Sequence, residues 1–322
     1  MAVSRVGLVL GAGGLPGHAW HCGVLAALAT ETGWDARSAD IIVGTSAGSG
    51  VAAYLRGGLT GTDLYDRLHR LGAPLHHDRL QAVSGQREPG DTTAAQPRRW
   101  RPVAPAVAAR ALLPPWRRPG VVIGALLQQG ELPTAAIGSW TAELHGDRWP
   151  DQPLWICAVD LTRGHRTVFG RDPVPAQVPV ATAVEASSAV PGFFQPVTIG
   201  GRRYIDGGMY SPTNADLLAD RHLELDVVIV SSPMSASGGT GPMTGRSYHH
   251  RLLEWETRRC RDLGSVVIRF EPGADVVALM SRGRRTLPGD MATIAGAALA
   301  SVRRHLRRHD VRSRLDDLAR SA

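Results

Sequence analysis

Two short apolar runs, each followed directly by a glycine-rich turn, constrain the fold of this chain most strongly. Val6–Leu10 ends at the glycine loop Gly11–Gly17, and the apolar spacing of His18–Thr30 then predicts a helix. Ile41–Val43 ends at the sequence G-T-S-A-G at 44–48, and residues up to 55 predict a second helix. Strand, glycine turn and helix, repeated in this way, are typical of a parallel sheet with crossover helices.

The rest of the chain continues this pattern with one interruption. Further strands are expected at Leu154–Val159, Arg166–Phe169, Val197–Ile199, Arg202–Ile205, Asp226–Ser231 and Val266–Phe270, and helices at Val180–Ser188, Ser247–Leu263 and Met291–Arg307. We expect a single domain over residues 1–322, with an irregular Pro/Arg-rich segment at about 75–120 and a helical tail at about 290–322. The segment at 75–120 is either a surface insertion or a mobile cap, since neighbouring Arg and Trp side chains suit lipid head groups.

Composition limits the partners and the compartment. The net charge of +7 comes entirely from arginine, because the sequence contains no lysine. This favours contact with an anionic membrane surface only weakly, and we expect no nucleic acid partner. Three distant cysteines and the lack of a signal segment or a membrane-spanning run predict a cytoplasmic protein, with peripheral membrane contact left open. We expect no metal and no cofactor, because no cluster has metal-ligand spacing.

The G-T-S-A-G motif places a serine on a tight turn after a buried strand. This G-x-S-x-G pattern predicts a nucleophile elbow, with Ser46 as the nucleophile and Gly44 and Gly48 as its small neighbours. The alternative is a Gly/Ser-rich connection without chemistry.

The glycine loop Gly11–Gly17 is a candidate anion site. Backbone N–H groups between a strand and a helix are left unpaired beside the positive end of the helix dipole. The anion is either a dinucleotide pyrophosphate or the oxyanion of an acyl-transfer intermediate. The spacing is one residue longer than the dinucleotide fingerprint, and Asp40 precedes the second strand, so the oxyanion interpretation is favoured.

A serine nucleophile needs a base, and the histidines considered are poorly placed for that role. His76, His77, His165, His249, His250, His305 and His309 lie in irregular, turn or helical segments. Asp206, by contrast, ends a strand in an Asp-Gly-Gly turn where a neighbouring group can approach closely. It predicts a Ser–Asp dyad in which burial raises the pKa of the aspartate, although Asp-Gly-Gly alone is also an ordinary hairpin turn.

The glycine loop, the G-x-S-x-G motif and the segment that ends in Asp-Gly-Gly together make the chain resemble the patatin-like phospholipase family. The resemblance covers Leu8–Gly17, Gly44–Gly48 and Ala186–Gly208, in the expected order over about 210 residues. It implies a three-layer α/β/α sandwich with a mostly parallel central sheet. It also implies Ser46 as nucleophile, Asp206 as base, and the amides of Gly13 and Gly14 as the oxyanion hole, supported by Gly11 and Gly17.

The sequence therefore predicts a serine acyl hydrolase for lipid esters, of the phospholipase A, lysophospholipase or esterase type. Ala12 and Pro16 depart from the family's glycine loop, which normally has a glycine and a basic residue at these places. A catalytically silent lipid-binding member is therefore one alternative. A nucleotide-binding α/β protein that uses Gly11–Gly17 is the other.

Overall fold

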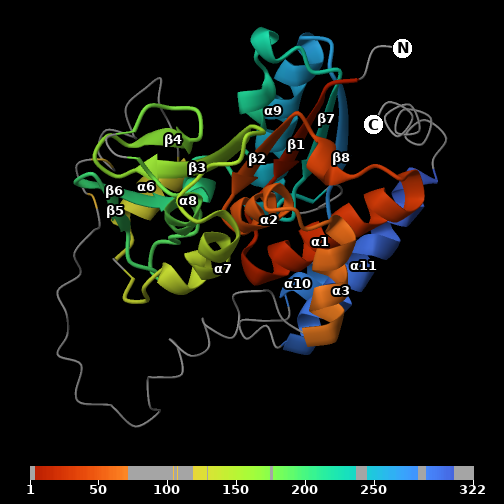
Figure 1. Ribbon diagram of the computed structural model, residues 1–322, viewed down its shortest axis with the longest axis horizontal. Coiled ribbons are helices and arrows are strands. Elements are labelled where there is room, and N and C mark those ends of the chain that lie inside the picture. The colour runs from red at the N-terminus through yellow and green to blue at the C-terminus, as the bar shows by residue number, and fades with distance from the viewer. Residues whose placement is uncertain are drawn as a thin grey trace.

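The computed structural model of the chain describes residues 4–71, 104, 107, 119–128, 130–174, 177–236, 245–281 and 288–307. In this part of the chain, a mostly parallel sheet has helices on both faces (Figure 1), which confirms the predicted fold class. The irregular segment expected at 75–120 lies outside the described residues, apart from 104, 107, 119 and 120.

The sheet has eight strands in the order β5-β6-β3-β2-β1-β7-β8, with β4 paired to β3. The pairs β1–β2, β1–β7, β2–β3 and β7–β8 are parallel, and β3–β4, β3–β6 and β5–β6 are antiparallel. The strands are β1 (Val6–Leu10), β2 (Ile41–Thr45), β3 (Leu154–Asp160), β4 (His165–Phe169), β5 (Val197–Ile199), β6 (Arg202–Asp206), β7 (Val227–Ser231) and β8 (Val266–Phe270).

Within the described residues, four helices were not indicated by the sequence pattern, namely α3 (Gly61–Leu71), α6 (Pro119–Leu126), α7 (Ala135–His145) and α10 (Ala274–Ser281). The α-helices are α1 (Gly14–Thr32), α2 (Ala47–Arg56), α3 (Gly61–Leu71), α6 (Pro119–Leu126), α7 (Ala135–His145), α8 (Val180–Ser187), α9 (Gly245–Asp262), α10 (Ala274–Ser281) and α11 (Pro288–Leu306). Short 3-10 turns are η1 (Ala36–Ser38), η2 (Gly207–Met209), η3 (Ala215–Leu218) and η4 (Arg221–Leu223).

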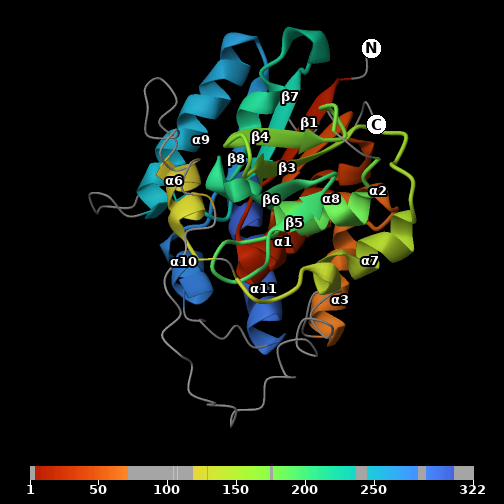
Figure 2. The same cartoon turned by 90° about the vertical axis from the view of Figure 1, so that its left-hand side faces the viewer.

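Alternation along the strands creates two cores, one on each face of the sheet. In β1, Leu8 and Leu10 pack with the helices of one face, whereas Val9 between them packs with Leu253 of α9 and with η3 on the other. Figure 2 shows α9 on one side of the strands, with α2, α7 and α8 on the opposite side. Because helices cover both faces of the sheet, the side chains on both sides of its central strands are buried. This explains why these strand sequences are almost continuously apolar.

Helix α1 begins earlier than the sequence spacing predicted, at Gly14 instead of His18. It ends at Thr32, where Gly33 adopts the left-handed conformation (φ 74°) and its N–H donates to Ala29 O. Along α1 lies α11, the first part of the expected helical tail, which buries one of its faces in the main core (Figure 1). Within the described residues, no helix is long and apolar enough to cross a membrane.

Candidate active site

Strands β2 and β6 meet end to end along one edge of β3, and this brings Ser46 and Asp206 together. Thr45 pairs with Cys157 of β3 in a parallel ladder, and Asp206 pairs with the next residue, Ala158, in an antiparallel ladder. Strand β4 occupies the opposite edge of the same β3 residues. The two strands therefore run towards each other and stop at adjacent positions, Ser46 directly after one and Asp206 at the end of the other.

Ser46 sits on a strained turn between β2 and α2. Its φ of 53° is unfavourable for a residue with a side chain, at a cost of about 1–3 kcal/mol. The N–H of Ser46 donates to Ser187 Oγ at 2.9 Å, and Ser187 Oγ donates to Cys157 O at 2.6 Å. This chain of hydrogen bonds ties the turn to α8 and β3, which holds the Ser46 backbone in its strained conformation.

The small residues around Ser46 are required by close backbone approach. A Cβ on Gly48 would lie 2.1 Å from Leu10 O, and one on Gly44 would lie 2.6 Å from Ser49 Cα. Both distances are shorter than atoms tolerate, so the start of α2 packs directly on β1 and β2 only because glycine occupies these positions. Both glycines of the G-x-S-x-G motif thus have a steric reason.

Asp206 is buried beside Ser46, with only 3% of its surface exposed, and Ser46 is 5% exposed. Burial raises the pKa of Asp206 from its ordinary value of 3.8 to about 6, and the hydrogen bonds from the Ser46 side chain and the Gly208 N–H oppose this rise. The Gly208 N–H lies 2.6 Å from Oδ1. The carboxylate is therefore oriented by one amide while it accepts a hydrogen bond from the serine.

The glycine loop has two amides that make no hydrogen bond within the described residues, and one of them belongs to Gly14, which lines the same cavity as Ser46. Gly11 N–H donates to Ser231 O at 3.0 Å, Ala12 N–H to Pro212 O at 2.7 Å, and Gly17 N–H to Gly13 O at 2.9 Å. In the described part of the chain, no acceptor takes the N–H of Gly13 or Gly14. These two amides stand at the start of α1, where the helix dipole favours negative charge.

Both departures from the usual glycine loop fit the structure. Pro16 is in the first turn of α1, where a backbone N–H would have no partner within the helix, so the missing donor does not disrupt the helix. The side chain of Ala12 faces Gly208, and a Cβ on Gly208 would come within 3.1 Å of the Ala12 Cβ. A glycine in the Asp-Gly-Gly turn therefore provides the space that Ala12 occupies.

His21 fixes the base of the glycine loop, and the sequence reasoning did not consider it. Its ring is fully buried, with Nε2 2.8 Å from Gly11 O and Nδ1 2.8 Å from Ser231 Oγ. Burial lowers its pKa to about 4, so the ring is neutral at physiological pH. Because Gly11 O can only accept, Nε2 carries the proton, and the Ser231 hydroxyl donates to Nδ1.

A buried polar network beneath the site joins the segments on either side of it. The Asn214 amide donates to Thr45 Oγ1 at 3.1 Å and to Ser211 O at 2.7 Å, and its Oδ1 accepts from Arg166 Nη1 at 3.0 Å. Arg166 also forms a two-pronged ion pair with Asp216, at 2.7 and 2.9 Å. The strand that carries Ser46 is thus bonded to the segment that follows the Asp-Gly-Gly turn.

Ser46 opens onto a mainly apolar cavity of about 350 Å³. Its walls come from α1, α2, α7, α8 and the segment after α8, and its lining includes Leu15, Tyr54, Ile137, Val184, Val190 and Phe194. His18 contributes a polar edge, with its ring edge-on to that of Tyr54 at a centroid distance of 6.2 Å. This cavity was not predicted from the sequence, although the spacing of Ser46 and Tyr54 by about two helical turns was a signal for it.

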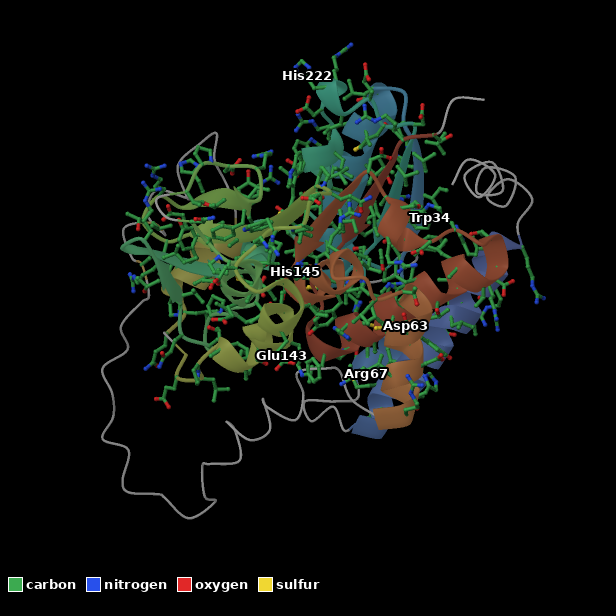
Figure 3. All side chains as sticks on the ribbon, in the orientation of Figure 1. Trp34, Asp63, Arg67, Glu143, His145 and His222 are labelled. Carbon is green, nitrogen blue, oxygen red and sulfur yellow. The ribbon has the colours of Figure 1, made fainter. Side chains whose placement is uncertain are left out.

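The α7 wall of the cavity is held in place by its neighbours. His145, labelled with Glu143 in Figure 3, lies at the end of α7 with Nε2 2.8 Å from Ala53 O of α2. Arg67 of α3 stacks over the ring of Trp140 at 4.8 Å. Helix α7 is therefore anchored to both α2 and α3, which fixes the position of Ile137 in the cavity.

The histidines considered from the sequence contribute nothing to this cavity where the structure describes them. His249 contacts Met234 O and His250 pairs with Glu271, and neither His165 nor His305 lines the cavity. His76, His77 and His309 lie outside the described residues. In the described part of the chain, no group of three or more His, Cys, Asp or Glu side chains could hold a metal ion.

The fold and the site define an α/β protein with a nucleophile candidate at the carboxyl end of the parallel strand β2, where such sheets place their sites, and with a buried aspartate brought beside it by the antiparallel strand β6. The chain belongs to the patatin-like phospholipase family, whose family model matches residues 8–219. Among solved structures, it resembles VipD from Legionella pneumophila, with 13% identity, coverage of 96% of this chain and 67% of VipD, and a TM-score of 0.44. No curated protein matches the sequence.

Proposed function

We propose that the protein is a serine acyl hydrolase for lipid esters, with Ser46 as nucleophile and Asp206 as general base. The observation that carries this proposal is the hydrogen bond between the two buried side chains, with Ser46 in the lining of the same cavity as Gly14. Family membership supports hydrolysis of a lipid ester as the reaction class.

In the first half of the reaction, Ser46 Oγ attacks the ester carbonyl carbon while its proton passes to Asp206. The carbonyl oxygen becomes an oxyanion that accepts from the Gly13 and Gly14 N–H groups. One such donor is typically worth about 2.7–4 kcal/mol of the barrier. Asp206 then returns the proton to the leaving alcohol as the C–O bond breaks, which leaves an acyl group on Ser46.

In the second half, water replaces the alcohol. Asp206 accepts a proton from a water molecule while the water oxygen attacks the carbonyl carbon of the acyl-enzyme. Asp206 then gives this proton to Ser46 Oγ when the carboxylic acid leaves. The raised pKa of Asp206, about 6, suits both tasks, because a carboxylate of ordinary pKa is a weaker base.

We also infer that the protein meets its substrate at an anionic lipid surface. The net charge of +7 and the side chain of Phe193, which is 66% exposed at the cavity, support this inference. The fraction of protein that sediments with anionic vesicles should fall steeply with added salt. Equal binding to zwitterionic vesicles would contradict an electrostatic contribution to membrane binding.

Hydrolysis of p-nitrophenyl acyl esters tests the reaction. Ser46→Ala and Asp206→Asn should each lower kcat by at least about 10³-fold, because each removes a group that acts in the transition state. Ser139→Ala, a half-buried change on α7 away from the cavity lining, serves as a matched control and should leave kcat unchanged. Full activity in Ser46→Ala would refute the mechanism. If the wild-type protein binds lipid but hydrolyses no ester, the protein is instead a catalytically silent lipid-binding member of the family.

A further inference from the structure

One face of α2 forms the floor of the cavity beside Ser46. Ser46 directly precedes α2, Gly50 and Tyr54 follow it within the helix at intervals of four residues, and all three line the cavity. On a helix, this spacing places side chains above one another on the same face. The floor therefore starts at the nucleophile, passes over a glycine and ends at an aromatic ring.

The cavity has an open end and a closed end. Phe193 is 66% exposed, whereas Val184 is 1% exposed and Tyr54 is fully buried. An acyl group attached to Ser46 Oγ can therefore extend over Gly50 towards Tyr54 and Val184, and exchange water for an apolar surface. Its alcohol part stays on the side of solvent.

Gly50 differs from the other glycines of the elbow. A Cβ on Gly50 would meet no atom within 4 Å, whereas one on Gly48 would collide with the backbone of β1. Gly50 also lies inside α2, has no left-handed backbone, and occupies a position where glycine is less favourable than alanine. Neither close packing nor backbone conformation therefore explains a glycine at this position. The absence of a side chain keeps the space over the helix open.

The volume sets the size of the acyl group. A cavity of about 350 Å³ is at the small end of the roughly 300–1,000 Å³ typical of ligand pockets. Water occupies about 30 Å³ per molecule in the liquid, and a methylene group is of similar size, so the cavity accommodates roughly a dozen heavy atoms. This is room for one medium-length chain and too little for two.

We propose that Gly50 determines acyl-chain selectivity, by keeping open a cavity that accepts a single straight acyl chain of roughly ten carbons. This inference rests on the proposed function, since it places the acyl group of the Ser46 ester in the cavity. The substrate class is therefore esters of one medium-length fatty acid, with the head group and any second chain outside.

A series of p-nitrophenyl esters from acetate to palmitate tests the inference. For the wild type, kcat/KM should rise by up to about fourfold per methylene and then level off near ten carbons. Gly50→Leu should lower the decanoate-to-acetate ratio of kcat/KM by at least about tenfold, since its side chain fills the space of four carbons. Val184→Ala should move the optimum to longer chains, because it enlarges the closed end.

Gly245→Leu is the matched control, because Gly245 is exposed at the start of α9 and its Cβ would also meet no atom within 4 Å. It should leave the ratio unchanged, and circular dichroism melts should show that every variant is folded. An unchanged ratio in folded Gly50→Leu, with wild-type ester hydrolysis intact, would overturn the inference and leave the proposed function standing. A wild type that hydrolyses no ester of the series would overturn both.

Discussion

Replacement of Asp206 by asparagine should make the protein more stable at neutral pH while it abolishes hydrolysis. In the folded protein, burial raises the pKa of Asp206 from 3.8 to about 6, so the folded state holds the ionised carboxylate less favourably than the unfolded chain does. Asparagine has nearly the same shape. Its oxygen can still accept from the Gly208 N–H, and its amide can donate to Ser46 Oγ.

The magnitude follows from the two pKa values. A folded pKa above the unfolded one means that folding favours the protonated form, so this contribution to stability is largest at low pH. It is lost as pH rises from about 4 to about 6. A shift of about two pKa units corresponds to about 3 kcal/mol, of which about 2 kcal/mol separates pH 4 from pH 8. Asp206→Asn removes this penalty.

Urea unfolding of wild type and variant at several pH values measures the effect. The difference in free energy of unfolding should favour Asp206→Asn by about 2 kcal/mol more at pH 8 than at pH 4, and any pH-independent change cancels in this comparison. Asp63→Asn on α3 is the control of opposite sign, because hydrogen bonds from Thr60 lower the pKa of Asp63. If the difference in free energy of unfolding between Asp206→Asn and wild type does not vary with pH, burial does not destabilise the ionised Asp206 carboxylate.

Three further results are expected. The kcat/KM of the wild type should fall about tenfold per pH unit below about pH 6, as Asp206 becomes protonated, and a flat profile down to pH 4 would exclude it as the base. Asn214→Ala should lower the free energy of unfolding by about 1–3 kcal/mol in urea titrations, because Arg166 loses a buried partner. Gly48→Ala should cost about 3 kcal/mol or more, since its Cβ would lie 2.1 Å from a β1 carbonyl oxygen, while Gly50→Ala should not destabilise the protein.

Much of the sheet was predictable because its strands are short apolar runs that end in glycine turns. The hairpin of β5 and β6 and the elbow after β2 lie where the sequence predicted them. Helix α3 was missed although Leu64 and Leu68 follow helical spacing. Helix α7 has only a weak apolar stripe and is positioned by contacts such as His145 with Ala53 O. Such long-range packing leaves no local trace in a sequence.

The candidate site, like the fold, was predicted from the sequence only in part. The motifs indicated Ser46 and Asp206 separately, but their meeting depends on the antiparallel register of β6 on β3, which no local pattern specifies. His21 carried no signal beyond a histidine within an apolar helix. The cavity over Gly50 required the side chains of several helices to be placed together.

Reaction of the purified protein with a fluorophosphonate, followed by peptide mass spectrometry, tests the central claim most directly. The reagent needs an activated serine nucleophile and an oxyanion site, and it does not depend on knowledge of the natural ester. A single adduct is expected on Ser46. It should be absent in Ser46→Ala and should form much more slowly in Asp206→Asn. A folded protein that gains no adduct, or gains one on another serine, would contradict this expectation.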